Sequence, residues 1–545
     1  MTRKKWIYCF GEGMLEGRSD MKALLGNKGA NLAEMASMGL PVPPGFTITT
    51  DACRHYLENG NRIHSEIIEQ IESGIGWLEQ LSGRKFGDLN RPLLVSVRSG
   101  AVQSMPGMMD TVLNVGLNDE IVAHLLEKTR SKRFILDCYR RLIAMYGSVV
   151  MGLGDQLFDD IIEDFRIQQG LRKDIDIIDA GWTQIIERYE KSILQEAGTE
   201  YPQNINEQFY ATIGAVFSSW YSPRAISYRA IQGLEEAGGT AVTIQMMVYG
   251  NRSGDSASGV AFSRNPANGE PGLYGEYLPM VQGEDIVDGF HSPRALSETA
   301  RGERGDKVAS LQTRMPAQFE RLEDIARQLE RRFRDMQEIE FTIEDGKLYV
   351  LQTRTAKRSL ETAIRVVLDL LDEGVIAKSE AVRRIPLKRF LKLTQSVIDP
   401  DCHATIITRG LPASPGAASG KIVFSPDEAV KKAKNGIAVV LVRNETSPND
   451  VAGMNASAAI LTRRGGMTSH AADIARDIGR PCIVDARFIE LDLDQGTMTV
   501  GRTVFSEGDE ITIDGSNGLV LAGRVVLRTP ELDEYGRRFK ALLEQ

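Results

Sequence analysis

The segment GGMTSHAADIAR contains the side chain best suited to covalent chemistry, a histidine at the start of a predicted helix. Gly465 and Gly466 follow a short apolar strand pattern, and Thr468, Ser469 and His470 come next. A neutral imidazole is a nucleophile, and its ordinary pKa of about 6.5 leaves much of it neutral at physiological pH. Unpaired amides at a helix N-terminus stabilise a phosphoryl group. The segment therefore suits a reactive imidazole, and its small neighbouring residues leave room for a phosphoryl group.

A phosphoryl donor needs cations around its phosphates and oxygen ligands for a metal ion, because positioning and charge neutralisation dominate this chemistry. In EIEFTIEDGKLYVLQTR, Glu338 and Glu340 alternate with Ile339 and Phe341. We expect both carboxylates to project from one face of a strand while the apolar pair packs inward. Two carboxylates on one face can hold Mg²⁺ through their oxygens.

The same segment predicts a β-hairpin, because an Asp-Gly pair at 345 and 346 separates two alternating apolar runs. A simple two-residue turn would pair Gln352 with Ile339 and would place Gln352 on the face opposite the glutamates. We therefore expect a longer loop or a bulge in this hairpin.

The histidine segment resembles, nearly residue for residue, the phosphohistidine motif of pyruvate, phosphate dikinases, in which the histidine carries phosphate between two distant sites. Ser469 stands where the related phosphoenolpyruvate synthases usually carry cysteine, which favours the dikinase branch. The resemblance implies that Thr468 is a regulatory phosphorylation position. Asp473 departs from the family pattern, which is usually apolar there; its carboxylate would either favour the helix dipole or repel an incoming phosphate.

Three other segments resemble the ATP-binding part of the same family: LLGNKGANLAEM, LLVSVRSGAVQSMPGMMDT with its covering SMPGMMDT loop, and QEIEFTIEDGKLYVLQTR. The nucleotide-binding residues that this resemblance implies are Lys28, Arg98, Glu338, Glu340, Gln352 and Arg354. Mg²⁺ would be held by Glu338, which replaces the more usual aspartate, together with Glu340 and Gln352. Arg98 would act with His470 in catalysis.

These residues must be positioned by several packed units, since 545 residues exceed the usual size of one domain. We expect an α/β multidomain chain, and the resemblance implies an ATP-grasp nucleotide-binding domain with a helical insertion, followed by a swivelling β/β/α phosphohistidine domain. The predicted divisions are 1–118, the first ATP-grasp subdomain; 119–200, the helical insertion; 201–355, the second ATP-grasp subdomain; 356–403, a helical linker; 404–525, the phosphohistidine domain; and 526–545, a remnant of a C-terminal linker.

The composition of the chain indicates which classes of partner and which cellular compartment to expect. The chain is 42% hydrophobic and 26% charged, as in ordinary globular proteins, and its net charge of −9 with interspersed signs disfavours nucleic acid. Five scattered cysteines form no CxxC pair, which is typical of a reducing compartment. Because the sequence has neither a signal-peptide pattern nor a run of about 18 apolar residues, we expect a cytoplasmic protein without a membrane partner.

The predicted activity is ATP- and phosphate-dependent phosphorylation of His470, the first half of a dikinase-like reaction that yields AMP and pyrophosphate. The family completes its cycle on a C-terminal barrel of roughly 250 residues. We expect that barrel to be absent after Gln545, so that a separate barrel protein or another acceptor takes the phosphate. Two alternatives stay open: an enzyme like the rifampin-type phosphotransferases, and a non-catalytic ATP-binding regulator or relic.

Overall fold

The computed structural model describes residues 4–103, 105, 108–129, 131–172, 174–232, 238–286, 293–386, 390, 397–399, 401–402, 404–528 and 531–544. Part of the predicted SMPGMMDT loop, at 104, 106 and 107, lies outside these residues. The chain forms two compact units: Met1–Val248 with Tyr349–Gln352, and Tyr249–Leu348 with Thr353–Gln545. Among the described helices, none combines the length and apolar character that a membrane span requires.

The first unit contains a six-stranded antiparallel sheet in the order β2-β1-β3-β6-β4-β5. Its strands are β1 (Ile7–Gly11), β2 (Met14–Leu15), β3 (Gly45–Ile48), β4 (Val95–Gly100), β5 (Thr111–Val115) and β6 (Ala241–Met246). Strands β3, β4 and β6 are mostly buried, as expected for apolar central strands covered on both faces. The sheet therefore gives a rigid support for side chains at the ends of β4.

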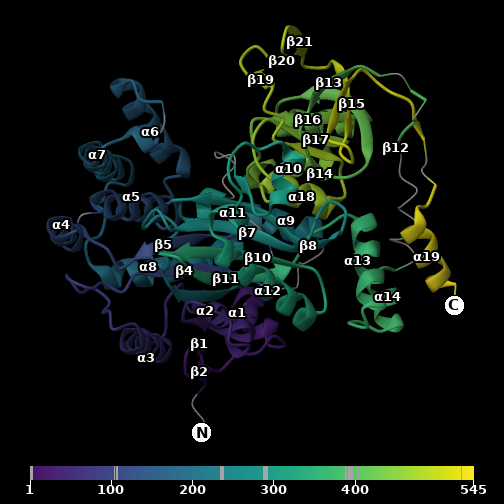
Figure 1. Cartoon of the computed structure of the whole chain (residues 1–545). Helices are drawn as coiled ribbons and strands as arrows, with labels where there is room; N and C mark the ends of the chain where they lie inside the picture. Colours follow the sequence, from purple (N-terminus) through teal and green to yellow (C-terminus); the bar gives the residue numbers. More distant parts are fainter. Residues whose placement is uncertain are drawn as a thin grey trace. The chain divides into compact units, whose positions relative to one another are not determined.

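The first unit also contains the helices α1 (Lys22–Ser37), α2 (Thr50–Glu58), α3 (Ser65–Ser82), α4 (Asp119–Lys128), α5 (Lys132–Val149), α6 (Asp155–Gln169), α7 (Asp179–Ala197), α8 (Ile205–Ser218) and α9 (Pro223–Gln232). Figure 1 shows α5 beside β5, with α6 and α7 next to it. Buried aromatic side chains join these helices, such as Phe158 of α6 and Tyr189 of α7, whose rings lie 5.0 Å apart.

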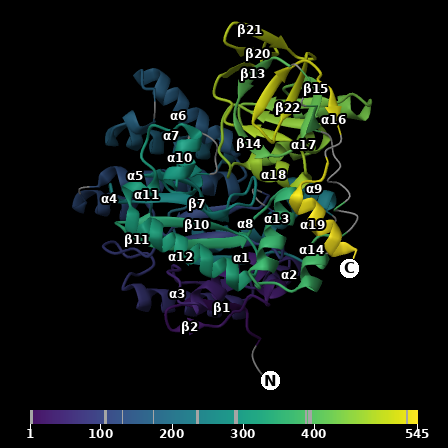
Figure 2. The same cartoon turned by 45° about the vertical axis from the view of Figure 1, so that its right-hand side comes forward.

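The second unit begins with a five-stranded sheet in the order β11-β10-β7-β8-β9. Its elements are β7 (Ala257–Arg264), β8 (Pro271–Pro279), β9 (Arg294–Ala295), α10 (Glu298–Arg304), α11 (Leu311–Arg314), α12 (Pro316–Phe333), β10 (Gln337–Glu344) and β11 (Lys347–Thr355). Helices α13 (Leu360–Asp372) and α14 (Lys378–Arg384) follow. Figures 1 and 2 both show α19 (Glu534–Leu543) alongside α13, and buried Phe539 of α19 belongs to the apolar core that α13 forms.

The remaining part of the second unit is built on an eight-stranded mixed sheet in the order β13-β23-β22-β15-β16-β17-β18-β14. These strands are β13 (Ile406–Arg409), β14 (Leu411–Ser414), β15 (Ala417–Val423), β16 (Val439–Arg443), β17 (Ala459–Thr462), β18 (Cys482–Val484), β22 (Glu510–Asp514) and β23 (Leu519–Ala522). The helices are α16 (Pro426–Lys434), α17 (Val451–Ala456) and α18 (His470–Ile478). A three-stranded sheet adds β19 (Ile489–Asp492), β20 (Thr497–Val500) and β21 (Thr503–Ser506), and β12 (Val397–Ile398) pairs with β24 (Leu527–Arg528).

The fold is mixed α/β and multidomain, as the sequence predicts. The six predicted divisions of the chain stay predictions. At the scale of single elements, the helix predicted near residue 470 begins at His470 itself.

The predicted hairpin forms, and of the longer loop or bulge that we expected, the longer loop is absent. Only Asp345 and Gly346 separate β10 from β11, and both have left-handed backbones, with φ of 49° and 77°. This conformation matches the two-residue turns that fit twisted antiparallel strands. In β11 the buried positions change from Leu348 and Val350 to Thr353, so the inward-facing side chains switch from even to odd numbers. A one-residue shift of this kind is what a β-bulge produces, which agrees with the other half of that expectation.

A buried guanidinium stabilises the joint between β7, α12 and α13. Arg264 is only 2% exposed, and its nitrogens lie 2.8 Å from Glu330, 3.1 Å from Asp369 and 2.9 Å from Glu373. Replacing Arg264 with methionine would leave these carboxylates partly buried without their cation, and we expect a loss of about 3 kcal/mol. Hydrogen exchange of the β7 amides measures this loss as faster exchange. Arg327→Met, at an exposed ion pair on α12, is the matched control, and equal exchange in both variants would contradict the prediction.

Candidate functional site

The start of α18 has the geometry that the histidine segment predicts. Ser469 is the N-cap residue, and its hydroxyl accepts a hydrogen bond from the Ala472 amide. His470 is the first helical residue, so its ring lies beside the unpaired amides of the first turn. Gly465, with φ of 103°, makes the turn between β17 and this helix. The segment thus brings His470 to a helix N-terminus through a tight connection.

The environment of His470 favours the neutral, nucleophilic ring. Burial lowers the pKa of His470, while the carboxylates of Asp473 and Asp450 and a hydrogen bond with the Ser447 backbone oppose this change. Nε2 is buried and has no hydrogen-bond partner within the described residues, so the nitrogen that contacts Ser447 is Nδ1. A proton held on Nδ1 leaves the lone pair on Nε2. This tautomer would leave Nε2 as the nucleophilic ring nitrogen.

A structured loop supplies the Ser447 backbone. Ser447 begins a short 3-10 turn, Pro448–Asp450, and its amide donates to the Asp450 carboxylate at 2.7 Å. The Ser447 hydroxyl in turn accepts from the backbone of this turn, which completes a capping box. The segment RNETSPNDVAGM, which contains this turn, therefore orients the ring of His470.

The lowered pKa of His470 predicts the pH dependence of its phosphorylation. Only the neutral ring attacks, so the rate should stay on its plateau below the ordinary value of 6.5 and fall as pH decreases through the lowered pKa. A profile of the rate at saturating ATP and Mg²⁺ between about pH 5 and 8 measures this midpoint. A midpoint at or above 6.5 would contradict the burial that we describe for this ring.

Arg354 joins two predicted parts of the site. Its Nη2 lies 2.5 Å from Oε1 of Glu338 and 3.4 Å from Oδ2 of Asp473, one turn after His470. Burial alone would raise the pKa of Asp473, but Arg354, Lys357 and Arg476 outweigh burial and hold that pKa well below its usual range. Asp473 is therefore ionised and pairs with a predicted phosphate ligand. The ion pair is a contact that adds to the two roles considered for Asp473, the dipole and the repulsion of phosphate.

The predicted glutamates occupy neighbouring positions on β10. The strand pairs with β7 in unbroken register from Glu338 to Ile343, so Glu338 and Glu340 share one face, and the buried Ile339 and Phe341 share the other. Burial raises the pKa of Glu338 although Arg354 lowers it. Glu340 is half-buried and contributes to the raised pKa of Arg354. The predicted alternation is correct, but the face of the glutamates is not open to solvent at Glu338.

The partners of Thr353 and Arg354 fit the bulge in β11. The Thr353 hydroxyl donates to the side chain of Gln337 at 3.0 Å, whereas Arg354 pairs with Glu338. Direct counting through the two-residue turn would instead put Thr353 opposite Glu338. The shift by one residue places Arg354 on the face of Glu338 and Glu340. Because Gln352 is two residues from Arg354, it points to this same side of β11.

A buried glutamate that the sequence analysis missed contacts the histidine segment. Glu276 of β8 is 0% exposed, and it accepts a hydrogen bond from the Thr468 hydroxyl at 3.2 Å. Its carboxylate also lies 3.0 Å from Arg304. Burial raises the pKa of Glu276, and Arg304 opposes this. A single acid in the strand-like run YGEYL was the available signal. With its hydroxyl bonded to Glu276, Thr468 is buried in this arrangement.

The first unit contains the other predicted residues. Arg98 of β4 donates from Nη1 to the Leu351 carbonyl and from Nη2 to the Gln352 side chain, both at 3.3 Å. A guanidinium held by two such bonds has a fixed orientation, which is useful for binding phosphate oxygens. Arg98 and Gln352 are therefore adjacent, as the predicted nucleotide site requires.

Lys28 lies on the part of α1 that packs against the end of β4. Gly26 interrupts the helix with φ of 67° and ψ of 169°, and the next amide, Asn27, donates to the Ala101 carbonyl at 2.7 Å. A Cβ atom on Gly26 would lie 1.9 Å from the Gly100 oxygen, so only glycine allows this approach. The glycine-spaced segment thus fixes Lys28 near the strand that bears Arg98.

The structure therefore brings together two groups of predicted residues, one in each unit. The first group is Lys28, Arg98 and Gln352, and the second is Glu338, Glu340, Arg354, Thr468 and His470. Over the described ranges there is no set of at least three His, Cys, Asp or Glu side chains that could hold a metal ion. The predicted Mg²⁺ ligands are two carboxylates and an amide, which is a different kind of set.

Two family models match this chain. The model of the pyruvate phosphate dikinase AMP/ATP-binding domain matches residues 22–81, 63–304 and 296–372. The model of the mobile domain of PEP-utilising enzymes matches residues 437–518, which include His470.

Curated relatives are similar over almost the whole chain. Pyruvate, phosphate dikinase of Rhizobium meliloti (strain 1021) is 50% identical over 534 residues, which cover 98% of this chain and 60% of that protein. The enzyme of Clostridium symbiosum is 46% identical, over 96% of this chain and 58% of that protein. The chloroplastic enzyme of Flaveria pringlei is 42% identical, over 100% of this chain and 56% of that protein. The chain spans about three-fifths of the length of these relatives. The model of the AMP/ATP-binding domain matches more than half of the residues of this chain. The chain therefore belongs to the pyruvate, phosphate dikinase family.

Proposed function

We propose that this chain catalyses the ATP- and phosphate-dependent phosphorylation of His470, the first half of a dikinase-like reaction. In the net reaction the β-phosphoryl group of ATP is bonded to Nε2 of His470, the γ-phosphoryl group is bonded to inorganic phosphate, and AMP and pyrophosphate leave. The observation that supports this most strongly is the ion pair between Asp473, on the His470 helix, and Arg354, a predicted phosphate ligand. It places the proposed nucleophile close to the proposed phosphate-binding strand.

The architecture belongs to the same proposal. We assign an ATP-grasp domain to 1–118 and 201–355, with 119–200 as its helical insertion, and a swivelling phosphohistidine domain to 404–525. The helical linker 356–403 would let the phosphohistidine domain move, and 526–545 would be a C-terminal linker segment. A cytoplasmic location fits the composition and completes the assignment.

The residues divide the work by charge. Lys28, Arg98 and Arg354 would neutralise and orient the phosphates of ATP, because developing negative charge must be met by fixed cations. The backbone amides at the start of α18 would receive the transferred group. Nδ1 of His470 would keep its proton through its bond with Ser447, which directs Nε2 toward phosphorus.

The proposed metal ligands fit a divalent cation. Oε2 of Glu338 is buried and has no hydrogen-bond partner among the described residues, and burial raises the pKa of this carboxyl group. A cation beside it would favour the ionised form and would use the remaining oxygen. Glu338, Glu340 and Gln352 would hold Mg²⁺, which when bound neutralises phosphate charge.

Pyruvate is the acceptor that the names of the relatives suggest for the phosphate on His470. These relatives are single polypeptides longer than the region that matches, so the comparisons give no support to a barrel on a separate protein. The rifampin-type enzyme and the non-catalytic regulator are less well supported, since the relatives are named dikinases. Thr468 remains a proposed regulatory position, and its phosphorylation would require the hydroxyl to leave Glu276.

Position-specific labelling tests the proposal. The full chain is incubated with Mg²⁺, inorganic phosphate and ATP that carries label at either the β or the γ position. We expect the β label to stay on the protein in an acid-labile form and the γ label to appear in pyrophosphate. Retention of γ label in the presence of phosphate, or ATP binding without any labelling, would overturn the proposed reaction.

A further inference from the structure

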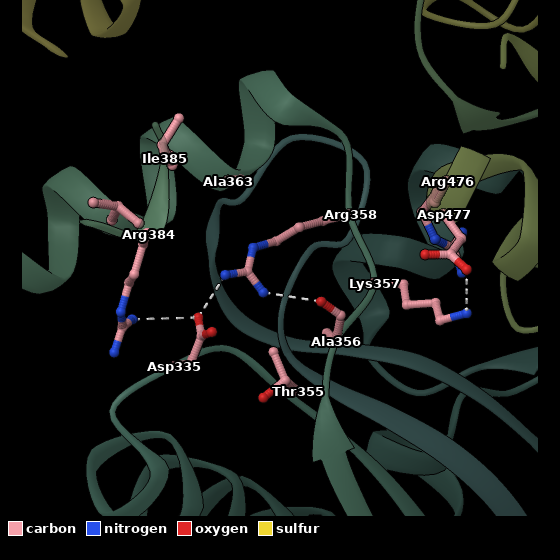
Figure 3. A pocket seen from close by; sticks show the side chains of 11 residues that line it. Asp335, Thr355, Ala356, Lys357, Arg358, Ala363, Arg384, Ile385, Arg476 and Asp477 are labelled. Carbon is pink, nitrogen blue, oxygen red and sulfur yellow. Dashed lines mark hydrogen bonds and ion pairs between the residues drawn. The ribbon is translucent and has the colours of Figure 1, made fainter. Parts of the chain in front are cut away.

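Two acidic side chains on the His470 helix face two cations, one near the end of β11 and one just after that strand. Asp473 and Asp477 are four residues apart in α18 and therefore lie on one face of the helix. Lys357 Nζ lies 3.0 Å from Asp477 and 3.9 Å from Asp473, and Arg354 Nη2 lies 3.4 Å from Asp473. Figure 3 shows Lys357 and Asp477 pointing toward each other. We name these four side chains the acidic clasp.

The helix dipole of α18 explains the position of only one of the two aspartates in the acidic clasp. Asp473 lies in the first turn of α18, where a carboxylate favours the helix dipole. Asp477 lies in the last turn, where a carboxylate is unfavourable to the same dipole. Its pairing with Lys357, from outside the helix, offsets this cost. The position of Asp477 therefore suits a contact between segments better than the stability of α18.

Burial and packing make the ion pairs important at this contact. Asp473 is only 4% exposed, so the loss of its cations would leave a buried charge unpaired. Beside the clasp lies a cavity of about 310 Å³, whose lining includes Lys357, Arg476 and Asp477 (Figure 3). Close apolar packing is therefore incomplete here. Charge pairing must supply part of the attraction and much of the orientation.

We propose that Asp473 and Asp477 are positioning residues, which clasp Arg354 and Lys357 and so hold the His470 helix against the phosphate-binding strand for phosphoryl transfer. This inference rests on the proposed phosphorylation of His470. It assigns to Asp473, the residue that departs from the family pattern, a role in docking. The clasp also places a negative charge one turn from His470, which favours separation once the ring carries a phosphoryl group.

Zero-length carbodiimide coupling tests the contact without requiring any reaction of ATP. The carboxylate of Asp477 is activated and then attacked by the Lys357 amine, so an amide bond forms and the urea by-product leaves. We expect the ligand-free full chain to give a Lys357–Asp477 cross-link in its peptide map. The exposed pair Lys431 and Glu428, 3.0 Å apart on α16, is the internal control. Coupling of the control pair without coupling of Lys357 and Asp477 would overturn the contact.

A charge exchange tests positioning. The single variants Lys357→Glu and Asp477→Lys should each slow His470 phosphorylation about tenfold at saturating ATP, because small misplacements of reacting groups are costly. The ATP dissociation constant should stay within about twofold, and the double variant should regain most of the lost rate. The same exchange at Lys431 and Glu428 should leave the rate unchanged.

The outcomes separate this inference from the proposed function. If the wild-type chain cross-links but is never phosphorylated, the contact is real, and both its positioning role and the proposed function are wrong. If the wild type is phosphorylated and the single exchanges act at the wild-type rate, the clasp does not position His470. The same conclusion follows if the fold-decrease of the phosphorylation rate in the double variant equals the product of the fold-decreases in the two single variants.

Discussion

Replacing His470 with asparagine should abolish retention of the β-phosphoryl group, while ATP still binds. Asparagine keeps a polar side chain at the start of α18 but lacks a nucleophilic ring nitrogen, and His470 is outside the proposed nucleotide-binding set. We expect the initial rate of protein labelling to fall by at least about 10³-fold, as is typical when a covalent nucleophile is removed. Rapid quenching of labelling reactions, with ATP binding measured in parallel, gives both quantities.

His124→Asn is the matched control for this substitution. His124 lies in α4, where its ring contacts Asn90 at 3.1 Å, and it belongs to no predicted site. Its loss should leave the labelling rate at the wild-type value. Full labelling of the His470→Asn variant would mean that another side chain is the nucleophile.

Replacing Arg98 with methionine should cause the second largest loss of activity. The guanidinium of Arg98 is oriented by the Leu351 carbonyl and the Gln352 side chain, and we place it on the phosphates of ATP. Removing one preorganised cation or donor from a charge-stabilising site lowers the rate by about 10² to 10³. Arg98→Lys should recover only part of the rate, since an ammonium lacks the planar fork of donors. Labelling rates at saturating ATP measure both effects.

Arg54→Met serves as the control for Arg98→Met. Arg54 is an exposed cation of α2 that pairs with Asp51 three residues earlier, and exposed pairs contribute little. This variant should keep wild-type activity. If Arg98→Met labels His470 as fast as Arg54→Met does, Arg98 has no role in the transfer.

Local sequence was sufficient to predict the start of the histidine helix. The run of small residues before His470 and the N-cap Ser469 determine this geometry within a few residues. The turn of β10 and β11 could also have been predicted fully, since Asp345 and Gly346 favour a two-residue turn. Of the two irregularities that we expected, a longer loop or a bulge, the structure has the bulge, because the register shifts inside β11. A bulge there leaves no clear sign in the residue types.

Contacts between segments far apart in the chain could not be predicted from the sequence. Glu276 and Thr468 are 192 residues apart, and nothing in the strand that bears Glu276 indicates which element covers it. The same is true of Asp473, whose cation comes from 119 residues earlier. The sequence indicated only local roles for this carboxylate. It predicted the helix that bears Asp473, but it did not indicate which segment packs against that helix. Pairing with Arg354 became evident only from the packing of α18 on the strand end.

Mapping the phosphorylated residue tests the proposed reaction most directly. The full chain is incubated with Mg²⁺, inorganic phosphate and ATP, kept alkaline so that phosphohistidine survives, and analysed by peptide mass spectrometry together with the AMP released. We predict one phosphoryl group, on the peptide that contains His470, and an equal amount of AMP. Phosphate on another residue, or bound ATP with no phosphorylated peptide and no AMP, would contradict the assignment of His470 as the phosphoryl carrier.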